Sequence, residues 1–344
     1  MWGACNMNDG QGGTRRICVC LEFLTDAHRI QIRQTAERLG FEVGFFDLTP
    51  KEEAREYLQN CEIFYGHTED LVRSAPSGLK WYCCSFAGVE PYCKDPAIFA
   101  NPDCLLSNTN CYGVTIAEHV VMIILMMLRS APGYAQLIQN RVWSNHLPIR
   151  TFQGHEVTTF QGHEVTLLGT GDIGNHAAQR LRAMGASHII GLNRSGRVHN
   201  DLYDEVFSIS QLDEVLPRTQ ILLMSLPSTP ETYHIMDNRR LRLLPSDAYL
   251  VNVGRGTAIV QEDLIEVMNS GHLAGAALDV VMPEPLPKDN PLWSVERLLL
   301  TPHVAGNMAK GYTCNLNVSM FCEDLENYAA GRPLKQFVNR KQGY

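Results

Sequence analysis

The sequence has no apolar stretch long enough to cross a bilayer. Its longest apolar run, Val120 to Leu128, lies between His119 and Arg129 and is far shorter than the ~20 apolar residues that a membrane helix needs. The first sixteen residues, MWGACNMNDGQGGTRR, lack the apolar core of a signal peptide. We therefore expect a cytoplasmic protein without a membrane partner, and a polar N-terminal tail outside the fold.

Basic residues are in the minority. The chain has 29 Lys and Arg against 37 Asp and Glu, and a formal net charge of -8. An acidic surface repels phosphate backbones and anionic lipids. We therefore expect a small-molecule partner and no nucleic-acid partner.

Cysteine is missing from the middle of the chain. The eleven cysteines all lie at or before Cys111 or at and after Cys314, and no C-x-x-C spacing occurs. An odd count without a secretory signal favours free thiols in a reducing compartment. These cysteines are more simply interpreted as small buried hydrophobes than as metal ligands, so we expect no metal site.

What the chain does contain is a regular alternation of strand and helix patterns over 344 residues, which is too long for one ordinary core. The patterns RICVCLEFL, FEVGFFD and CEIFYGH predict strands, with helical patterns between them. A long helix is predicted over about Val114–Arg129, and a second alternation starts with HEVTLLGTG. This order predicts two α/β units with parallel sheets. A late helical pattern in the tail, about Asn307–Tyr344, predicts a helix that packs back on the first unit.

A glycine pattern, G-x-G-x-x-G, occupies Gly169, Gly171 and Gly174. It follows a predicted strand and opens a predicted helix, the context that a dinucleotide-binding turn requires. The first glycine permits the turn, the second lets the backbone approach a pyrophosphate, and the third lets helix and strand pack closely. The free N–H groups at the helix start, including those of Asp172 and Ile173, suit phosphate oxygens. An ordinary glycine-rich turn is the weaker alternative.

The octapeptide TFQGHEVT occurs twice in succession, at 151–158 and 159–166. Only the second copy runs directly into the strand and the glycines. If the first copy formed the strand, the glycines would arrive eight residues late, a miss of roughly 26 Å. We therefore predict that copy two makes the strand, and that copy one is a dispensable insertion from a local duplication.

Three charged side chains follow predicted strands later in the chain: Arg255, Glu284 and His303. Ligands of such sheets bind at the carboxyl ends of the strands. Hydride transfer to a 2-keto acid needs a cation for the carboxylate, which Arg provides as a bidentate fork. It also needs a proton donor such as His, with a carboxylate to orient it. Each residue alone could be an ordinary surface or capping group; together, after a dinucleotide turn, they favour catalysis.

The strand that follows the glycine helix ends in SHIIGLNRSGR. NAD-binding proteins place an acid here to bind the ribose 2′-hydroxyl, but this position is Asn193. Arg194, Ser195 and Arg197 follow and could bind a 2′-phosphate. We therefore expect NADP(H) as the preferred cofactor, with NAD(H) as the second option; a solvated basic loop with loose specificity is the alternative.

The sequence resembles the D-isomer-specific 2-hydroxyacid dehydrogenase family. The resemblance rests on LLGTGDIG, SLPSTPETYHIMD, LVNVGRGTAIVQEDLIEVMNSGHLAGAALDV, PEPLP and LLLTPHVAG, and the duplicated octapeptide departs from the family pattern. It implies two Rossmann-like/flavodoxin-like domains with an active-site cleft between them. A substrate domain would cover 1–108 and 307–344, and a dinucleotide-binding domain 109–306. The long helix would lie in the family's dimer-forming region, which makes a homodimer the expected assembly.

The resemblance also assigns roles to single residues. It implies that His303 is the acid/base, that Glu284 pairs with it, and that Arg255 binds the substrate carboxylate. Backbone amides of Ala87, Gly88 and Val89 would share that carboxylate, and Asp279 would hold the nicotinamide carboxamide. Further cofactor contacts would come from Leu226, Pro227, Thr232, Val253 and Gly306.

Two other readings of the function stay open. A formate-type dehydrogenase would carry an amide at the position of Glu284, so that residue argues against it. A non-catalytic, dinucleotide-sensing corepressor on the same fold could retain all three charged residues. The favoured reading is an oxidoreductase that transfers a hydride between NADP(H) and a small 2-keto or 2-hydroxy acid of the D series.

Overall fold

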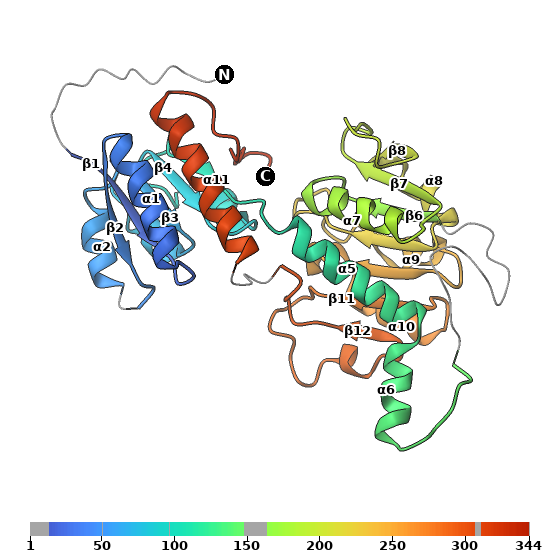
Figure 1. The fold of residues 1–344 in the computed structure, drawn as a ribbon. Coiled ribbons are helices and arrows are strands. Elements are labelled where there is room, and N and C mark those ends of the chain that lie inside the picture. Colours follow the sequence, from blue (N-terminus) through green and yellow to red (C-terminus); the bar gives the residue numbers. More distant parts are fainter. Residues whose placement is uncertain (1–13, 50, 96, 148–163, 307–310, 344) are drawn as a thin grey trace. The chain divides into compact units, whose positions relative to one another are not determined.

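The computed structural model describes residues 14–49, 51–95, 97–147, 164–306 and 311–343. By its internal contacts the chain divides into two compact units: unit 1, residues 1–111 with 308–344, and unit 2, residues 112–307. Figure 1 traces both along the chain. The N-terminal tail lies outside the described residues apart from its last three positions.

Unit 1 is a five-stranded parallel sheet in the order β2-β1-β3-β4-β5. The strands are β1 Arg15–Cys20, β2 Phe41–Phe46, β3 Ile63–Gly66, β4 Trp81–Cys84 and β5 Leu105–Ser107. The helices are α1 Asp26–Arg38, α2 Glu52–Leu58, α3 Glu69–Arg73, α4 Glu90–Lys94 and α11 Tyr312–Ala329. Because helices cover both faces, β3 and β4 are buried throughout and β1 over its last four residues, whereas the edge strand β2 is mostly only partly buried.

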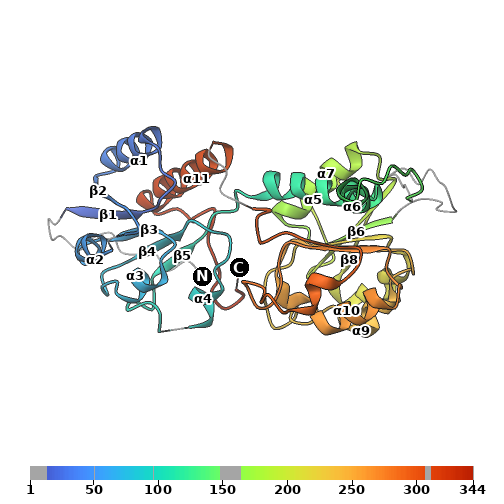
Figure 2. The same ribbon diagram turned by 90° about the horizontal axis from the view of Figure 1, so that it is seen from below.

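The two faces of this sheet bury different side chains. Ile17 and Val19 of β1 pack with the C-terminal helix α11, whereas Cys18 and Cys20 pack toward α2. Helices α1 and α11 lie side by side on one face, while α2 and α3 cover the other (Figures 1 and 2). The prediction that the tail helix packs on the first unit is confirmed.

Unit 2 is a seven-stranded parallel sheet in the order β12-β11-β10-β9-β6-β7-β8. Its strands are β6 Glu164–Leu168, β7 His188–Asn193, β8 Glu205–Ser208, β9 Ile221–Met224, β10 Tyr249–Asn252, β11 Gly275–Leu278 and β12 Leu298–Leu300. Its α-helices are α5 Gly113–Leu128, α6 Ala131–Gln139, α7 Asp172–Ala183, α8 Leu212–Val215, α9 Asn238–Leu243 and α10 Gln261–Asn269. The strand order reverses beside β6, which is where ligands bind in open α/β sheets.

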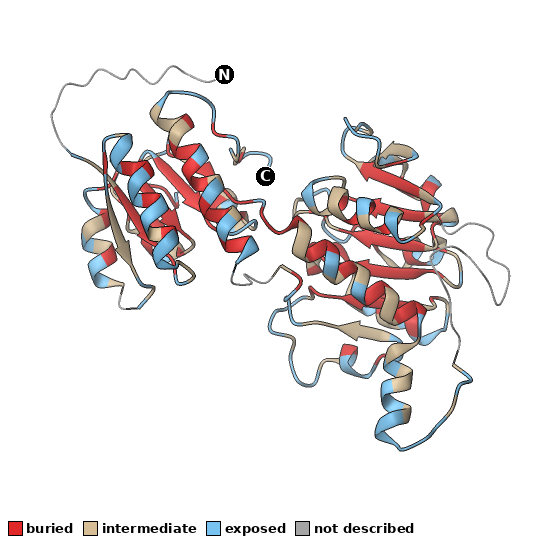
Figure 3. Ribbon diagram, viewed as in Figure 1, coloured by how far each residue is buried: buried red, intermediate tan, exposed pale blue. Residues whose placement is uncertain are grey.

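Helices α5 and α7 cover one face of this sheet and α9 and α10 the other (Figure 2), and the central strands are buried (Figure 3). No single helix among the described residues has the length and apolarity to cross a membrane. Helices α5 and α6, bent by 64°, meet those criteria only as a pair. Much of α5 is core: Ala117, Val120 and Ile124 are fully buried.

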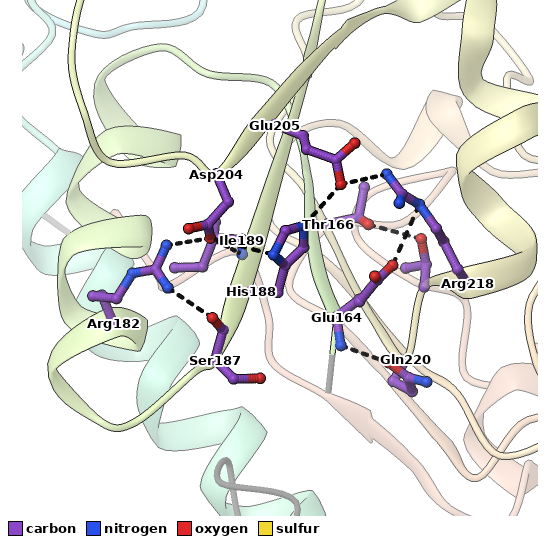
Figure 4. A network of polar contacts seen from close by, with 11 residues as sticks. Glu164, Thr166, Arg182, Ser187, His188, Ile189, Asp204, Glu205, Arg218 and Gln220 are labelled. Atoms are coloured by element: carbon purple, nitrogen blue, oxygen red, sulfur yellow. Dashed lines mark hydrogen bonds and ion pairs between the residues drawn. The ribbon is translucent and has the colours of Figure 1, made fainter. Parts of the chain in front are cut away.

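A polar network fixes the amino end of strand β6 (Figure 4). Glu164, the first residue of β6, lies 3.3 Å from Arg218, which also pairs with Glu205 at 2.9 Å. The Glu164 amide donates to the side chain of Gln220. Copy two of the octapeptide therefore supplies the first three residues of β6, as predicted. Its remaining residues and all of copy one lie outside the described residues.

The ten described cysteines are free thiols, as the sequence predicted. Burial raises the pKa of Cys61 to about 12 and that of Cys20 to about 11. Such thiols stay protonated at neutral pH, so they act as packing groups rather than as nucleophiles.

Candidate active site

The glycine turn joins β6 to α7 with the geometry of a phosphate-binding site. Gly169 has φ +113°, which a side chain would strain, and a Cβ on Gly174 would lie 2.1 Å from the Gly169 oxygen. A Cβ on Gly171 would meet nothing within 4 Å. The turn is thus closely packed at Gly174 and open at Gly171. The residues present therefore fit a dinucleotide pyrophosphate.

The side chain of Asp172 is bound to helix α5 and is not placed to bind a phosphate. Its carboxylate accepts a hydrogen bond from the Gly113 amide at the start of α5, and a Cβ on Gly113 would lie 2.3 Å from its Oδ2. Although the side chain keeps 38% exposure, desolvation raises the pKa of Asp172, opposed by the charge of His176 3.5 Å away. Only the backbone amide of Asp172 is therefore suited to a phosphate, and the carboxylate ties α7 to α5.

The loop after β7 is shaped by Asn193. Its Nδ2 donates to Thr170 Oγ1 and to the Arg197 carbonyl, both at 2.8 Å. Its Oδ1 accepts the amides of Ser195 and Gly196. The asparagine is thus a structural residue that folds the loop, while the two arginines are exposed on it.

An acid outside the predicted site, Glu231, lies near this loop. The hydroxyl of Thr229 and the backbone of Glu231 itself lower the pKa of Glu231, and the positive charge of Arg194 adds to that shift. Glu231 is far from Arg194 in the sequence, so no local motif could have revealed it. The negative charge of Glu231 would oppose the binding of an anion at Arg194.

Two catalytic candidates and one predicted cofactor residue follow three adjacent strands. Arg255 comes three residues after β10, Asp279 directly after β11, and His303 three residues after β12. Because β10 pairs with β11 and β11 with β12, all in parallel, these positions share one edge of the sheet. The topology therefore brings together residues that are up to 48 positions apart in the chain.

His303 and Glu284 form a direct pair. His303 Nδ1 lies 2.7 Å from Glu284 Oε2, and 52% of the histidine side chain is exposed. Glu284 also accepts the Val281 amide at 3.0 Å, which holds the carboxylate in place. Since one ring nitrogen is bound to the carboxylate, the other is left to face a ligand.

Asp279 is almost fully buried, with 3% exposure. Its carboxylate accepts the Thr301 hydroxyl at 2.6 Å and the amides of Val304 and Ala305 at 2.9 and 3.0 Å. Those residues flank His303, so Asp279 builds the loop that carries the histidine. The structure supports this loop-forming role directly, and the predicted contact with a nicotinamide carboxamide stays a prediction.

His119 of α5 is a second residue that sequence reasoning did not select. Its Nε2 lies 3.2 Å from Thr301 Oγ1 and 3.8 Å from Asp279 Oδ1. Burial lowers the pKa of His119, and the charge of Asp279 opposes that shift. In the sequence it only flanks an apolar run, which gives no signal of this contact.

Arg255 lies in a closely packed turn. Its Nη1 donates to the Gly254 carbonyl at 2.8 Å, and its own carbonyl accepts from Asn252 at 3.0 Å. A Cβ on the following Gly256 would lie 2.2 Å from the Val281 carbonyl oxygen. The backbone around Arg255 is therefore fixed, and its half-buried side chain starts from a defined position.

The other predicted cofactor residues lie in unit 2, near the carboxyl ends of its strands. Leu226 and Val253 are buried just beyond β9 and β10. Thr232 Oγ1 donates to the Pro227 carbonyl at 2.6 Å, and Gly306 approaches α5, where a Cβ would lie 3.2 Å from Ile116. They line the same edge of the sheet as the catalytic candidates.

The predicted substrate amides belong to unit 1. Residues 85–89, here called the amide loop, follow β4 at the carboxyl edge of its sheet. Among the hydrogen bonds of the described residues, none uses the amide of Ala87, Gly88 or Val89 as donor. Adjacent main-chain donors of this kind suit a carboxylate.

Comparisons with known proteins point to one family. Residues 121–305 match the NAD binding domain of the D-isomer specific 2-hydroxyacid dehydrogenases. Glyoxylate/hydroxypyruvate reductase A of Enterobacter sp. (strain 638) is 32% identical over 235 residues, which make up 67% of this chain and 70% of that protein.

Two solved structures share the fold over almost the whole chain. An NADPH-dependent glyoxylate/hydroxypyruvate reductase of Sinorhizobium meliloti, in complex with NADP and sulfate, has a TM-score of 0.77 and 26% identity. A probable 2-hydroxyacid dehydrogenase of Rhizobium etli CFN 42, in complex with NADP, HEPES and L(+)-tartaric acid, has a TM-score of 0.75 and 26% identity. Each match covers 96% of this chain and 100% of the other.

Proposed function

Because the chain belongs to the D-isomer specific 2-hydroxyacid dehydrogenases and is an NAD(P)-dependent oxidoreductase, we propose that it reduces small 2-keto acids to D-2-hydroxy acids with NADPH. The observation that carries this proposal is the 2.7 Å contact between His303 and Glu284. It lies on the same sheet edge as the glycine turn. The relatives are named as reductases and dehydrogenases, so a non-catalytic corepressor is not favoured.

The bound cofactor supplies the hydride, and His303 supplies the proton. In the reduction direction His303 donates Nε2–H to the carbonyl oxygen as that oxygen gains electrons. Glu284, bound to Nδ1, fixes the ring orientation and stabilises the charged imidazolium before transfer. In the reverse direction the same nitrogen removes the hydroxyl proton.

The substrate carboxylate has two sets of donors. Arg255 offers a planar fork that matches a carboxylate in geometry and charge. The amide loop of unit 1 offers the main-chain N–H groups of residues 87–89. We propose that both take part. Unit 1 would then recognise the substrate while unit 2 holds the cofactor.

NADP(H) is the proposed cofactor. Arg194 and Arg197 are exposed on the loop after β7, and no acid stands at position 193. The structures from Sinorhizobium meliloti and Rhizobium etli both contain NADP. A 2′-phosphate carries up to two negative charges, and guanidinium groups bind it more strongly than they bind a ribose hydroxyl.

A homodimer is the proposed assembly, and the face of α6 supports it. Every described residue of this helix is at least partly exposed, and Ile138 is 74% exposed. Trp143, just beyond the helix, is fully exposed, and Met122 of α5 is 45% exposed. Large apolar side chains that lie together on an exposed surface mark sites of protein–protein contact. The ten free thiols support a reducing compartment such as the cytoplasm.

The test of this function is His303→Ala. Removal of the proton donor should lower kcat for glyoxylate by a factor of about 100 or more, while the dissociation constant for NADPH stays close to that of the wild type. A matched control is His272→Ala, which removes a half-buried histidine bound to the Leu244 carbonyl in the same unit. Near-normal turnover in His303→Ala would show that another group donates the proton.

A further inference from the structure

The amide loop is held by buried polar side chains from the segment after β5 and from helix α11. Asn108 Nδ2 donates to the Ala87 carbonyl at 2.7 Å. Thr109 Oγ1 and Asn317 Nδ2 both donate to the Ser85 carbonyl at 2.8 Å. All these contacts lie within unit 1. The loop is therefore held at two carbonyl groups: that of Ser85 at its start, and that of Ala87, which directly precedes the Gly88 amide.

Because the peptide bond is planar, the hydrogen bond to the Ala87 carbonyl also fixes the direction of the next N–H group. In a trans peptide the C=O of one residue and the N–H of the next point to opposite sides. When Asn108 binds the Ala87 carbonyl, it therefore aims the Gly88 amide away from the interior. That amide is one of the three without a donor bond among the described residues. The contact of Asn108 thus orients a group proposed to bind substrate.

The donors themselves are firmly held. Asn317 is fully buried on α11, accepts from the Tyr65 hydroxyl, and donates also to Thr109 Oγ1 at 3.0 Å. Asn108 is 8% exposed, and its backbone N–H donates to the Gln336 carbonyl at 3.2 Å. Buried polar side chains are costly unless each is bonded, so this network has one strongly preferred arrangement.

The C-terminal segment completes the support. Val338 donates to the Leu106 carbonyl at 2.9 Å, and Ser107 forms an antiparallel bridge with Phe337. The buried carboxylate of Asp324 on α11 accepts the amides of Lys335 and Gln336. The last helix and the tail therefore form one rigid backing for Asn108.

We propose that Asn108 is a positioning residue that sets the direction of the Gly88 N–H, that Asn317 fixes the start of the amide loop at the Ser85 carbonyl, and that both thereby set the affinity for the substrate carboxylate. The proposal rests on the proposed function, since it gives these amides their ligand. It identifies a substrate-affinity determinant in the crossover after β5 and in the last helix, outside every motif that carried the sequence reasoning.

The test is the pair Asn108→Ala and Asn108→Asp. Both remove the donor to Ala87, and the neutral variant separates this loss from an added negative charge. A hydrogen bond to a charged ligand is worth about 1.5–3 kcal/mol, so misdirected amides should raise KM for glyoxylate by about tenfold or more. kcat should change by less than about threefold, and NADPH affinity should stay unchanged, because no reacting group has moved.

Asn101 provides the matched control. Its Nδ2 donates to the Leu79 carbonyl at 2.8 Å, also within unit 1, but away from the amide loop. Asn101→Ala and Asn101→Asp lose the same kind of bond and should leave KM unchanged even if they lower the melting temperature. Equal KM changes in the Asn101 and Asn108 variants, or none in either, would overturn the proposal.

Two further variants keep the test decisive. If the Asn108 variants fail to fold, Thr109→Val keeps the shape of the side chain, removes one donor to Ser85 and should raise KM several-fold; an unchanged KM overturns the proposal. Arg255→Lys, measured in parallel, distinguishes a failure of the positioning role from a failure of the proposed carboxylate binding. If only Arg255→Lys raises KM, the positioning role is wrong and the proposed function stands. If neither raises KM, carboxylate binding by these groups is wrong as well.

Discussion

At the scale of single residues, His303 holds a backbone conformation that side chains rarely adopt. Its φ is +53°, in the left-handed region, which costs about 1–3 kcal/mol for a residue with a Cβ. Its amide donates to the Asp279 carbonyl at 2.8 Å, and the Asp279 carboxylate holds the next two amides. Asp279 therefore maintains the strained turn that presents His303 to Glu284.

Two arginines should decide the cofactor. Replacing Arg194 and Arg197 together with alanine should lower kcat/KM for NADPH by about tenfold or more, because each can give a charge-assisted hydrogen bond to the 2′-phosphate. kcat/KM for NADH should change little. Asn193 is left intact, since its amide folds the loop.

The control for this change is Arg242→Ala, which removes an exposed arginine paired with Glu266 in the same unit. Glu231→Gln offers a complementary measurement: without its carboxylate near Arg194, NADPH affinity should rise. A double variant whose NADPH-to-NADH ratio equals that of the wild type would show that this loop does not bind the 2′-phosphate.

At the scale of elements, β6 is anchored by contacts that do not involve the first octapeptide. Thr166 Oγ1 lies 2.7 Å from Thr219 Oγ1, and Glu164 is held by Arg218 and Gln220. These contacts start at the end of copy two (Figure 4). The strand that leads into the glycine turn is thus fixed from position 164 onward.

Deletion of residues 151–158 should therefore leave a folded, active enzyme. The deletion keeps TFQGHEVTLLGTGDIG intact, and surface connections tolerate changes of length at little cost. Turnover and NADPH affinity should match the wild type within about twofold. Deletion of residues 159–166 yields the identical sequence, so a single variant tests both copies. Loss of cofactor binding would show that the duplication has become structurally necessary.

The long elements could be predicted from the sequence, and several short ones could not. Strands β6 and β7 and helices α5 and α7 gave strong patterns, because runs of apolar residues or a clear helical period extend over at least five positions. Strand β5 has three residues and β8 has four partly exposed ones, EVFS. Such segments are too short for a period to emerge, and only sheet pairing makes them strands.

The same limit applies to the site. The glycine turn and the strand ends at Arg255 and His303 carry local patterns, so sequence reasoning could propose them. His119, Glu231 and Asn108 act through contacts with residues distant in the chain. The position of Asn108 depends on the pairing of β5 with the C-terminal segment. No local pattern encodes that pairing.

At the scale of the whole molecule, the proposed function would divide the chemistry between the two units. Unit 2 carries the glycine turn and the His303–Glu284 pair, and unit 1 carries the amide loop with its buried support. The proposed reaction delivers a hydride to one face of the carbonyl group of a carboxylate-bearing substrate. It should therefore form a single stereoisomer, which the family's description leads us to expect in the D form.

The most direct test is the reduction of hydroxypyruvate by the purified full-length chain with NADPH. The account predicts that NADPH is consumed, that one D-hydroxy acid forms for each NADPH oxidised, and that the amide of the keto acid is a much poorer substrate. Formation of the L-isomer, equal rates with the amide, or no turnover of any small 2-keto acid by protein that binds NADPH would contradict it.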